Sequence, residues 1–278
     1  MASPDVMPYS NATALVLARG AAGTAAATVI ALVARRAGAL STSGAWATVL
    51  VGAAAVTAGW RWGALLELYF SAAVLLSRFG RADKERRTGG VVAKGGARDA
   101  TQVAANGGIF AACMLAAAFG PPAFGATMGL AALGALASSS ADTWATEIGT
   151  QFGGTPRSVL TLRPLATGTS GAISLLGSLA MVAGAAFVGG VAKWLGLGDM
   201  VLVVALAGIG GALADSLLGA ALQERRWCPA CAVSSERPVH DCGVATTHAG
   251  GHEWIDNDMV NLLSTFAGAA MAPLLANL

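Results

Sequence analysis

Acidic side chains stand within or beside several apolar segments of the sequence. Asp142, Glu147, Asp215 and Asp258 each adjoin a run rich in Ala, Gly, Leu and Val. Ionisable groups are costly inside a bilayer, so several of them near one membrane face indicate a functional site. Carboxylates are the usual protein ligands of Mg²⁺, which takes its other oxygens from water and phosphate. The sequence therefore predicts a magnesium site, with Asp142 and Asp215 as its main ligands.

The spacing of these carboxylates sets conditions on the helices that carry them. Asp142 and Glu147 are separated by about 140° around a continuous helix, so they converge only if the helix breaks between them. Asp258 and Asn261 are three residues apart and share a helix face. The simpler alternatives are that Asp256 merely caps the last helix and that Asp142 pairs with an arginine of a neighbouring loop.

A second group of residues has the chemistry of a phosphate site. Lys94 and Arg98 flank a glycine pair before an expected helix start, where backbone N–H groups favour anions. A small hydroxyl-rich turn is predicted to open another helix on the same face, and it consists of Gly168, Thr169, Ser170 and Gly171. This turn is not a Walker loop, because the lysine of that motif is missing. The alternative for the basic residues is a cytoplasmic loop that binds anionic lipid.

A third pattern, in an otherwise polar segment, has the spacing of a metal site. Cys228 and Cys231 form a C-x₂-C pair, and Cys242 follows them closely. Three thiolates and one imidazole fit a closed, tetrahedral structural Zn²⁺ site. The fourth ligand is left open among three histidines, His240, His248 and His252. A metal would also explain how a segment with so few apolar residues holds its shape.

The elements that carry these groups are predicted to be membrane helices. The chain has a mean hydropathy of +0.63 and is only 12% charged, about half the charge of soluble domains. These values exclude a soluble globular domain, and no nucleic-acid partner is expected. A helix needs about 20 apolar residues to cross the hydrocarbon core. The candidate segments, of which the second and third are short, are 12–34, 43–59, 62–79, 101–119, 122–143, 168–191, 199–222 and 258–277.

The distribution of charge orients these helices. If the long basic loop 80–100 is cytoplasmic, 14 of the 17 Lys and Arg residues lie on that side, with both chain ends opposite. We therefore predict an all-α polytopic membrane protein with about eight transmembrane helices and a polar site at its cytoplasmic face. Residues 1–79 form N-terminal helices, and residues 80–278 form a core that includes a Cys/His loop at 223–257.

Four motifs resemble, in the same order, those of a known family. Segment 141–149, Ala-Asp-Thr-Trp-Ala-Thr-Glu-Ile-Gly, is similar to an Ala-Asp-Thr-Trp-Ala-Ser-Glu motif, and 168–171 to a Gly-Thr-Asn-Gly turn. Segments 214–220 and 254–261, Ala-Asp-Ser-Leu-Leu-Gly-Ala and Trp-Ile-Asp-Asn-Asp-Met-Val-Asn, complete the set. Together they resemble the phytyl-phosphate kinase family of the vitamin E pathway, which also contains transmembrane protein nineteen. The Cys/His insert is similar to prokaryotic members and favours a bacterial inner membrane over a plastid envelope.

The resemblance implies an integral-membrane kinase that transfers the γ-phosphate of CTP, or of another nucleoside triphosphate, to phytyl or prenyl phosphate. Such chemistry needs positioning and charge neutralisation more than covalent catalysis. On this hypothesis Asp142 and Asp215 hold Mg²⁺, with Glu147 and Asp258 in support. The phosphates are neutralised and positioned by Lys94, Arg98, Arg163, Asn106, Asn261 and the 168–171 turn. Membrane lipids are expected partners, and a homo-oligomer stays open.

Other functions use the same ingredients. A cytidylyltransferase acting on a lipid phosphate would release pyrophosphate and leave CMP on the lipid, whereas the kinase releases CDP. A transporter would also place acidic residues and broken helices in the membrane, but its site would lie near the midplane. A non-catalytic assembly protein that docks through the Cys/His loop leaves Asp142 and Asp215 unexplained.

Overall fold

Helices dominate the computed structural model, which describes residues 9–92 and 95–278. Within these ranges the helices are α1 (Tyr9–Arg36), α2 (Thr42–Ala58), α3 (Trp60–Arg78), α4 (Arg81–Thr88), α5 (Ala100–Phe119), α6 (Pro122–Phe152), α7 (Leu175–Trp194), α8 (Val201–Ala221) and α9 (Asn257–Ala276). Short strands occupy the loops: β1 (Arg157–Ser158), β2 (Ala172–Ile173), β3 (Arg225–Cys228), β4 (Val233–Ser235) and β5 (Thr247–Gly250). The predicted helical class is confirmed.

The number of helices that could cross a membrane agrees with the prediction of about eight. Among the described residues, six helices are long and apolar enough, or seven if the bent pair α3–α4 is one span. Helix α2, with 17 residues, is apolar but shorter. The eight predicted segments correspond to α1, α2, α3 and α5 to α9.

Two predicted boundaries are wrong. Helix α6 continues to Phe152, past the predicted segment end at 143. The 168–171 turn does not open a helix, because α7 begins only at Leu175. Gly168 and Gly171 have φ values of +90° and +75°, a left-handed conformation that a right-handed helix excludes. The helix instead starts after Ser174, whose hydroxyl accepts a hydrogen bond from the backbone N–H of Gly177 at 3.1 Å.

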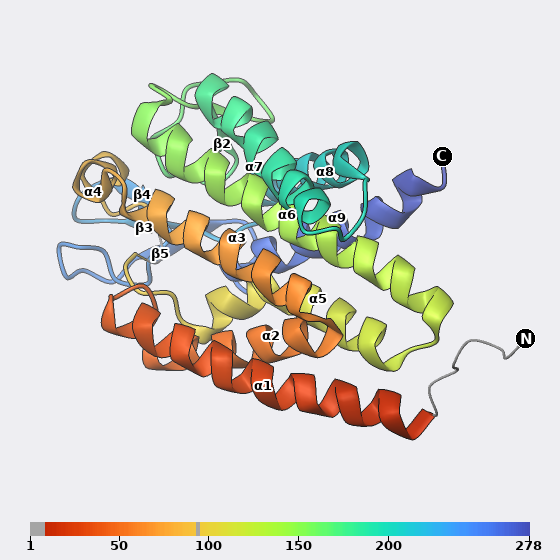
Figure 1. Cartoon of the computed structure of the whole chain (residues 1–278). Coiled ribbons are helices and arrows are strands. Elements are labelled where there is room, and N and C mark those ends of the chain that lie inside the picture. Colours follow the sequence, from red (N-terminus) through yellow and green to blue (C-terminus); the bar gives the residue numbers. More distant parts are fainter. Residues whose placement is uncertain (1–8, 93–94) are drawn as a thin grey trace, which may run out of the picture.

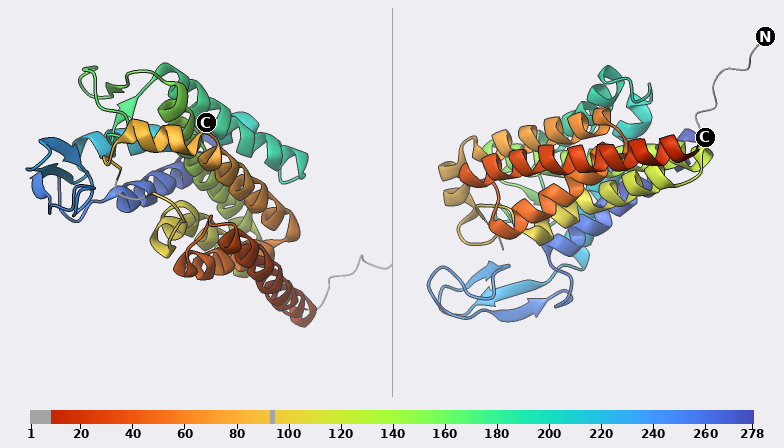
Figure 2. Two further views of the ribbon diagram at one scale, coloured as in Figure 1. Left: turned by 90° about the vertical axis from the view of Figure 1, so that its left-hand side faces the viewer. Right: turned by 60° about the horizontal axis from the view of Figure 1, so that its bottom comes forward.

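The polar loops gather at one end of the helix layer. Figure 1 shows α4 and the strands β3–β5 at the end opposite the C-terminus, and the right-hand view of Figure 2 shows the β3–β5 sheet beyond the helices. The sheet has the order β4-β3-β5, with both pairs antiparallel. The long helix α6 is central, since it packs against α5, α7, α8 and α9.

Small residues bring the helices around α6 unusually close together. A Cβ atom at Gly134 would lie 2.2 Å from the carbonyl oxygen of Gly268 on α9, and one at Gly211 of α8 would lie 2.2 Å from Ser138 Oγ. The Ser138 hydroxyl donates to the carbonyl oxygen of Ser264 on α9 at 3.0 Å. Such contacts are typical of membrane helices, whose backbones approach where side chains are small.

Replacement of Gly134 by Ala is expected to destabilise the protein, because the added methyl meets backbone that cannot move aside. Overpacking of this kind lowers the free energy of unfolding by about 1–3 kcal/mol. The matched control is Gly190→Ala on α7, where an added Cβ meets nothing within 4 Å. Thermal unfolding in detergent should separate the two variants, and equal melting temperatures would contradict the close α6–α9 contact.

Candidate functional site

Two half-buried carboxylates lie near each other where α6 and α8 pack. Asp142 of α6 acts electrostatically on Asp215 of α8, and the Ser264 side chain of α9 also interacts with Asp215. Oδ2 of Asp215 is buried and has no hydrogen-bond partner in the described part of the chain. An ionised carboxylate in this situation is strongly disfavoured unless a cation joins it. The pair therefore fits the predicted Mg²⁺ site, in which the ion would neutralise phosphate charge.

Glu147 is engaged elsewhere. Helix α6 is continuous from Asp142 to Glu147, so the break that would bring both side chains to one point does not occur. The Ser77 hydroxyl donates to Glu147 Oε1 at 2.7 Å, and Lys84 forms an ion pair with Oε2. The geometry therefore does not favour the supporting role at Mg²⁺ that the sequence assigned to Glu147. The charge of Glu147 still acts on Asp142.

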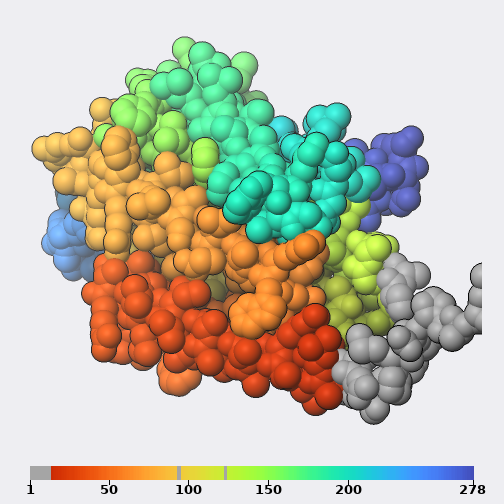
Figure 3. Space-filling view, in the orientation of Figure 1, coloured from red at the N-terminus to blue at the C-terminus, as the bar shows by residue number. Residues whose placement is uncertain are grey.

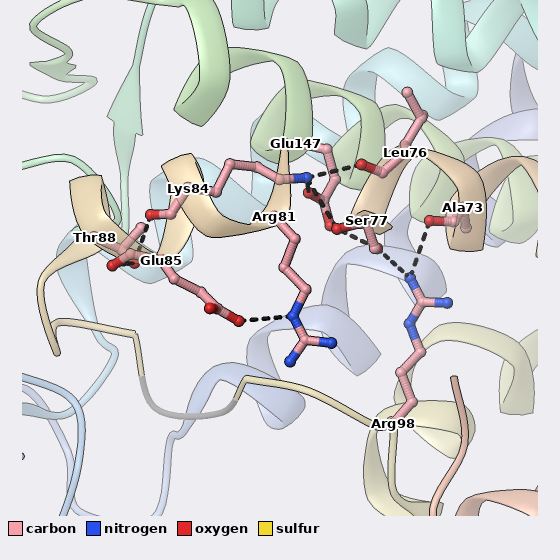
Figure 4. A network of polar contacts seen from close by, with 9 residues as sticks. All are labelled: Ala73, Leu76, Ser77, Arg81, Lys84, Glu85, Thr88, Arg98 and Glu147. Carbon is pink, nitrogen blue, oxygen red and sulfur yellow. Dashed lines mark hydrogen bonds and ion pairs between the residues drawn. The ribbon is translucent and has the colours of Figure 1, made fainter. Parts of the chain in front are cut away.

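Lys84 is a functional candidate that the sequence analysis missed. Its side chain is only 9% exposed, and its ammonium also donates to the carbonyl oxygens of Leu76 and Ser77 at 2.8 and 3.2 Å (Figure 4). A bend of 67° between α3 and α4 turns Lys84 back toward α6. Gly80, with a φ of +63°, stands at this bend. In the sequence, the residue pair Phe79-Gly80 indicates a break in the helix. It does not indicate that the Lys84 side chain turns toward α6.

Arg98 belongs to the same network. Its Nη2 donates to Ser77 Oγ at 3.0 Å, so Ser77 links Arg98 to Glu147 (Figure 4). Its backbone is fixed by hydrogen bonds to Ala39 and Ser41, both at 3.0 Å. The predicted partner cation Lys94 lies outside the described residues.

A buried chain of hydrogen bonds crosses from α3 to α5. The Ser139 hydroxyl of α6 donates to Asn106 Oδ1 at 2.6 Å, and Tyr69 Oη lies 2.7 Å from Ser139 Oγ. Because the single Ser139 proton is used, Tyr69 is the donor in the second bond. Tyr69 also interacts electrostatically with Arg98 and Asp142 and through its side chain with Thr143. Arg98, Tyr69 and Asp142 therefore lie in one neighbourhood, and Asp142 in turn acts electrostatically on Asp215.

An apolar cavity of about 330 Å³ has Tyr69, Arg98 and Asn106 in its lining. Its walls come mainly from α1, α2, α3 and α5. The polar part of its lining consists of Thr48, Glu67, Tyr69, Arg98, Gln102, Asn106 and Thr143. Exposed residues of α3, Trp60 and Ala64, also belong to the wall, so the cavity reaches the molecular surface. Figure 3 shows α1 (red) and α3 (orange) along this face, with a hollowed seam between them.

The remaining predicted phosphate residues lie around the end of α8. A Cβ at Gly171 would lie 2.3 Å from the Ala220 Cβ, so the 168–171 turn packs on α8 as closely as glycine permits. Arg163 is exposed on the loop that precedes this turn, and the structure does not bring it into the Asp142–Asp215 pair. Asp258 lies in the first turn of α9, and the largely buried Asn261 donates to the carbonyl oxygen of Asn257 at 3.0 Å.

The Cys/His loop brings four ligand atoms together. Cys228, Cys231, His240 and Cys242 have all their ligand atoms within 4.8 Å of one another. Backbone and side-chain hydrogen bonds lower the pKa of the Cys228 thiol in spite of the opposing effect of burial. The pKa of Cys231 rises to about 11, mainly through its hydrogen bond with Cys242 and further through its other neighbours in the cluster.

Comparison with known proteins identifies a family and relatives that cover most of the chain. The family described as "Integral membrane protein DUF92" matches residues 25–269. "Protein PGR" of Arabidopsis thaliana is 32% identical over 250 residues, which cover 81% of this chain and 85% of the relative. An uncharacterized membrane protein of Synechocystis sp. is 28% identical, and the match covers 77% of this chain and 73% of the relative. An uncharacterized membrane protein of Methanocaldococcus jannaschii is 32% identical, and the match covers 60% of this chain and 67% of the relative. No solved structure matches the chain. None of these names states a kinase activity, so the expected activity stays a prediction.

Proposed function

This chain belongs to the DUF92 family of integral membrane proteins, and we propose that it is a prenyl-phosphate kinase. It transfers the γ-phosphate of CTP, or of another nucleoside triphosphate, to phytyl phosphate or a related isoprenoid monophosphate. An oxygen of the lipid phosphate attacks the γ-phosphorus, the bond from that phosphorus to the β–γ bridging oxygen breaks, and CDP leaves with the lipid diphosphate as the other product.

The observation that carries this proposal is the apolar cavity whose lining includes Arg98, Tyr69 and Thr143, the last of which follows Asp142 in α6. A substrate with a long hydrocarbon tail and an anionic head needs an apolar wall and a cation at one end. The cavity lining is mainly apolar and includes the cation Arg98. Each methylene that leaves water stabilises the complex by about 0.8 kcal/mol.

The residues of the site have separate tasks in this proposal. Asp142 and Asp215 hold Mg²⁺, which neutralises charge on the nucleotide phosphates when it is bound. Arg98 binds the lipid phosphate, and its bond to Ser77 keeps the guanidinium at the cavity end. The backbone of the 168–171 turn lies against the end of α8 and offers N–H groups to the nucleotide. No strong general base is needed, because the lipid phosphate is already an anion.

Two neighbouring alternatives differ in what they predict. A cytidylyltransferase would use the same carboxylates but attach CMP to the lipid. A transporter would need a site near the middle of the membrane, whereas Glu147, Lys84 and Arg98 lie next to α4 and the polar loops. A bacterial inner membrane, with the site facing the cytoplasm, remains part of our proposal.

Narrowing the cavity is expected to weaken binding of long prenyl phosphates selectively. Ala26 of α1 lies on the cavity wall. Ala26→Phe should raise the KM for geranylgeranyl phosphate at least tenfold, which corresponds to a loss of about 1.4 kcal/mol in binding free energy. The KM for a five-carbon prenyl phosphate should change little. The matched control is Ala25→Phe, because Ala25 is the exposed neighbour on the same helix and is not part of the wall. Equal KM changes for both chain lengths would place the tail elsewhere.

A further inference from the structure

The Cys/His loop has the geometry of a closed tetrahedral metal site. Cys228 Sγ lies 3.5 Å from Cys242 Sγ, and His240 Nδ1 lies 3.3 Å from Cys242 Sγ. A tetrahedral Zn²⁺ with Zn–S bonds of about 2.3 Å holds its sulfur ligands about 3.8 Å apart. These two distances differ from tetrahedral values by only a few tenths of an ångström, and all four ligand atoms lie within 4.8 Å of one another.

Two tight turns present these ligands. Ala232 has a φ of +52°, and its N–H donates to the Cys228 carbonyl oxygen at 2.9 Å, which closes the turn that carries Cys231. In the second turn the Gly243 N–H donates to the His240 carbonyl oxygen at 2.8 Å, with a φ of +82° at Gly243. The ligands thus come in two pairs, one from each turn.

The structure also chooses among the three histidines. Only His240 has a ring nitrogen in the cluster formed by the described residues. His248 Nδ1 lies 3.5 Å from Glu224 Oε1, and the His252 ring packs against Trp254 with ring centroids 6.1 Å apart. The candidate metal ligands are therefore three cysteines and one histidine (Cys₃His), with His240 as the imidazole ligand.

The segment between the two turns fastens the polar loops to one another. Residues 235–237 donate three hydrogen bonds to the backbone carbonyl oxygens of residues 90–92. Ser235 Oγ donates to the Gly90 oxygen at 3.0 Å, the Glu236 N–H to the Val91 oxygen at 2.8 Å, and Arg237 Nε to the Val92 oxygen at 2.7 Å. The Ser170 hydroxyl donates to Glu236 Oε1 at 2.6 Å, so the 168–171 turn joins the same segment.

We propose that Cys228, Cys231, His240 and Cys242 bind one structural Zn²⁺, and that this ion holds residues 235–237 against the 90–92 segment and the 168–171 turn. Four protein ligands close the coordination sphere, so the metal has no open position for catalysis. Few apolar side chains support this loop, and metal binding supplies the free energy that fixes its shape. The metal content of this site can be tested without the kinase activity proposed above.

The test begins with metal analysis of the full-length protein in detergent. The purified protein is expected to contain about one Zn²⁺ per chain. Cys228→Ser and His240→Ala should lose it, whereas His248→Ala and His252→Ala should retain it. Cys113→Ser is the matched control, because Cys113 lies on α5, outside the cluster. Loss of zinc in His248→Ala with retention in His240→Ala would overturn the ligand assignment.

Two further measurements keep the proposal testable if the variants fold poorly. Co²⁺ added to metal-depleted wild-type protein should give the thiolate-to-cobalt charge-transfer absorption of a tetrahedral site, and Zn²⁺ should abolish it. Metal removal should speed hydrogen exchange at the Glu236 amide, which donates to Val91. If the protein binds neither Zn²⁺ nor Co²⁺ and Cys228 forms a disulfide with Cys242, the proposed metal site is overturned. If metal removal leaves hydrogen exchange at the Glu236 amide unchanged, the proposed role of the ion is overturned.

Discussion

Replacement of Asp215 by Asn is expected to lower kinase turnover by more than about a hundredfold and to leave the protein folded. Metal ligands stabilise the developing charge of phosphoryl transfer by several kcal/mol, which corresponds to losses of this size. The isosteric amide keeps the volume of the side chain but removes the negative charge. The unpartnered Oδ2 means that no hydrogen bond in the described chain is lost at that atom. Asp142→Asn should behave in the same way.

The matched control for these variants is Asp199→Asn. Asp199 is exposed and pairs with Lys193 at 2.9 Å, away from the acidic pair. Turnover of this variant should stay near that of the wild type, and all three proteins should have similar melting temperatures. Near-normal turnover of Asp215→Asn at saturating Mg²⁺ would remove Asp215 from the site.

The second large effect is expected at Lys84. Lys84→Met leaves Glu147 without its cation in a position where only 21% of its side chain is exposed. Breaking a buried ion pair by removal of one partner costs about 3–5 kcal/mol, because the remaining charge is uncompensated. We expect a lower melting temperature and, since Ser77 connects Glu147 to Arg98, weaker binding of prenyl phosphate.

A double variant separates the ion pair from other effects of the substitution. Lys84→Met combined with Glu147→Gln removes both charges and should recover much of the lost stability. The exposed pair Arg81–Glu85, with N–O distance 2.7 Å, is the control, and Arg81→Met should cost less than about 1 kcal/mol. Strictly additive losses at Lys84 and Glu147 would show that the two side chains are not coupled.

The sequence was most informative where a residue type conflicts with its surroundings. Asp142 and Asp215 stand in apolar runs, and this conflict alone predicted that they act together near one membrane face. The structure brings them together through the small residues of α6, α8 and α9, which the composition indicated only in general terms. The cysteine spacing likewise predicted a cluster, although it left three histidines open.

The features that the sequence did not predict depend on where the backbone bends and turns. Lys84 looked like one more cation of a basic loop, and only the bend at Gly80 turns it toward Glu147. The 168–171 turn was assigned to a helix start because it stands at the beginning of the candidate membrane segment 168–191. Ser174 was in fact the readable cap, since its hydroxyl accepts from the N–H three residues later. The choice of His240 follows from the positions of two turns, which spacing alone does not determine.

The most direct test of the proposed activity follows the γ-phosphate of CTP. Purified protein in detergent, with Mg²⁺ and geranylgeranyl phosphate, is supplied with γ-labelled CTP in one reaction and α-labelled CTP in another. We predict that γ-label appears in the lipid diphosphate, that α-label stays in CDP, and that Asp142→Ala abolishes the transfer. Transfer of α-label to lipid would instead identify a cytidylyltransferase. No label in lipid from CTP or any other nucleoside triphosphate, across prenyl phosphates of different length, would contradict the kinase.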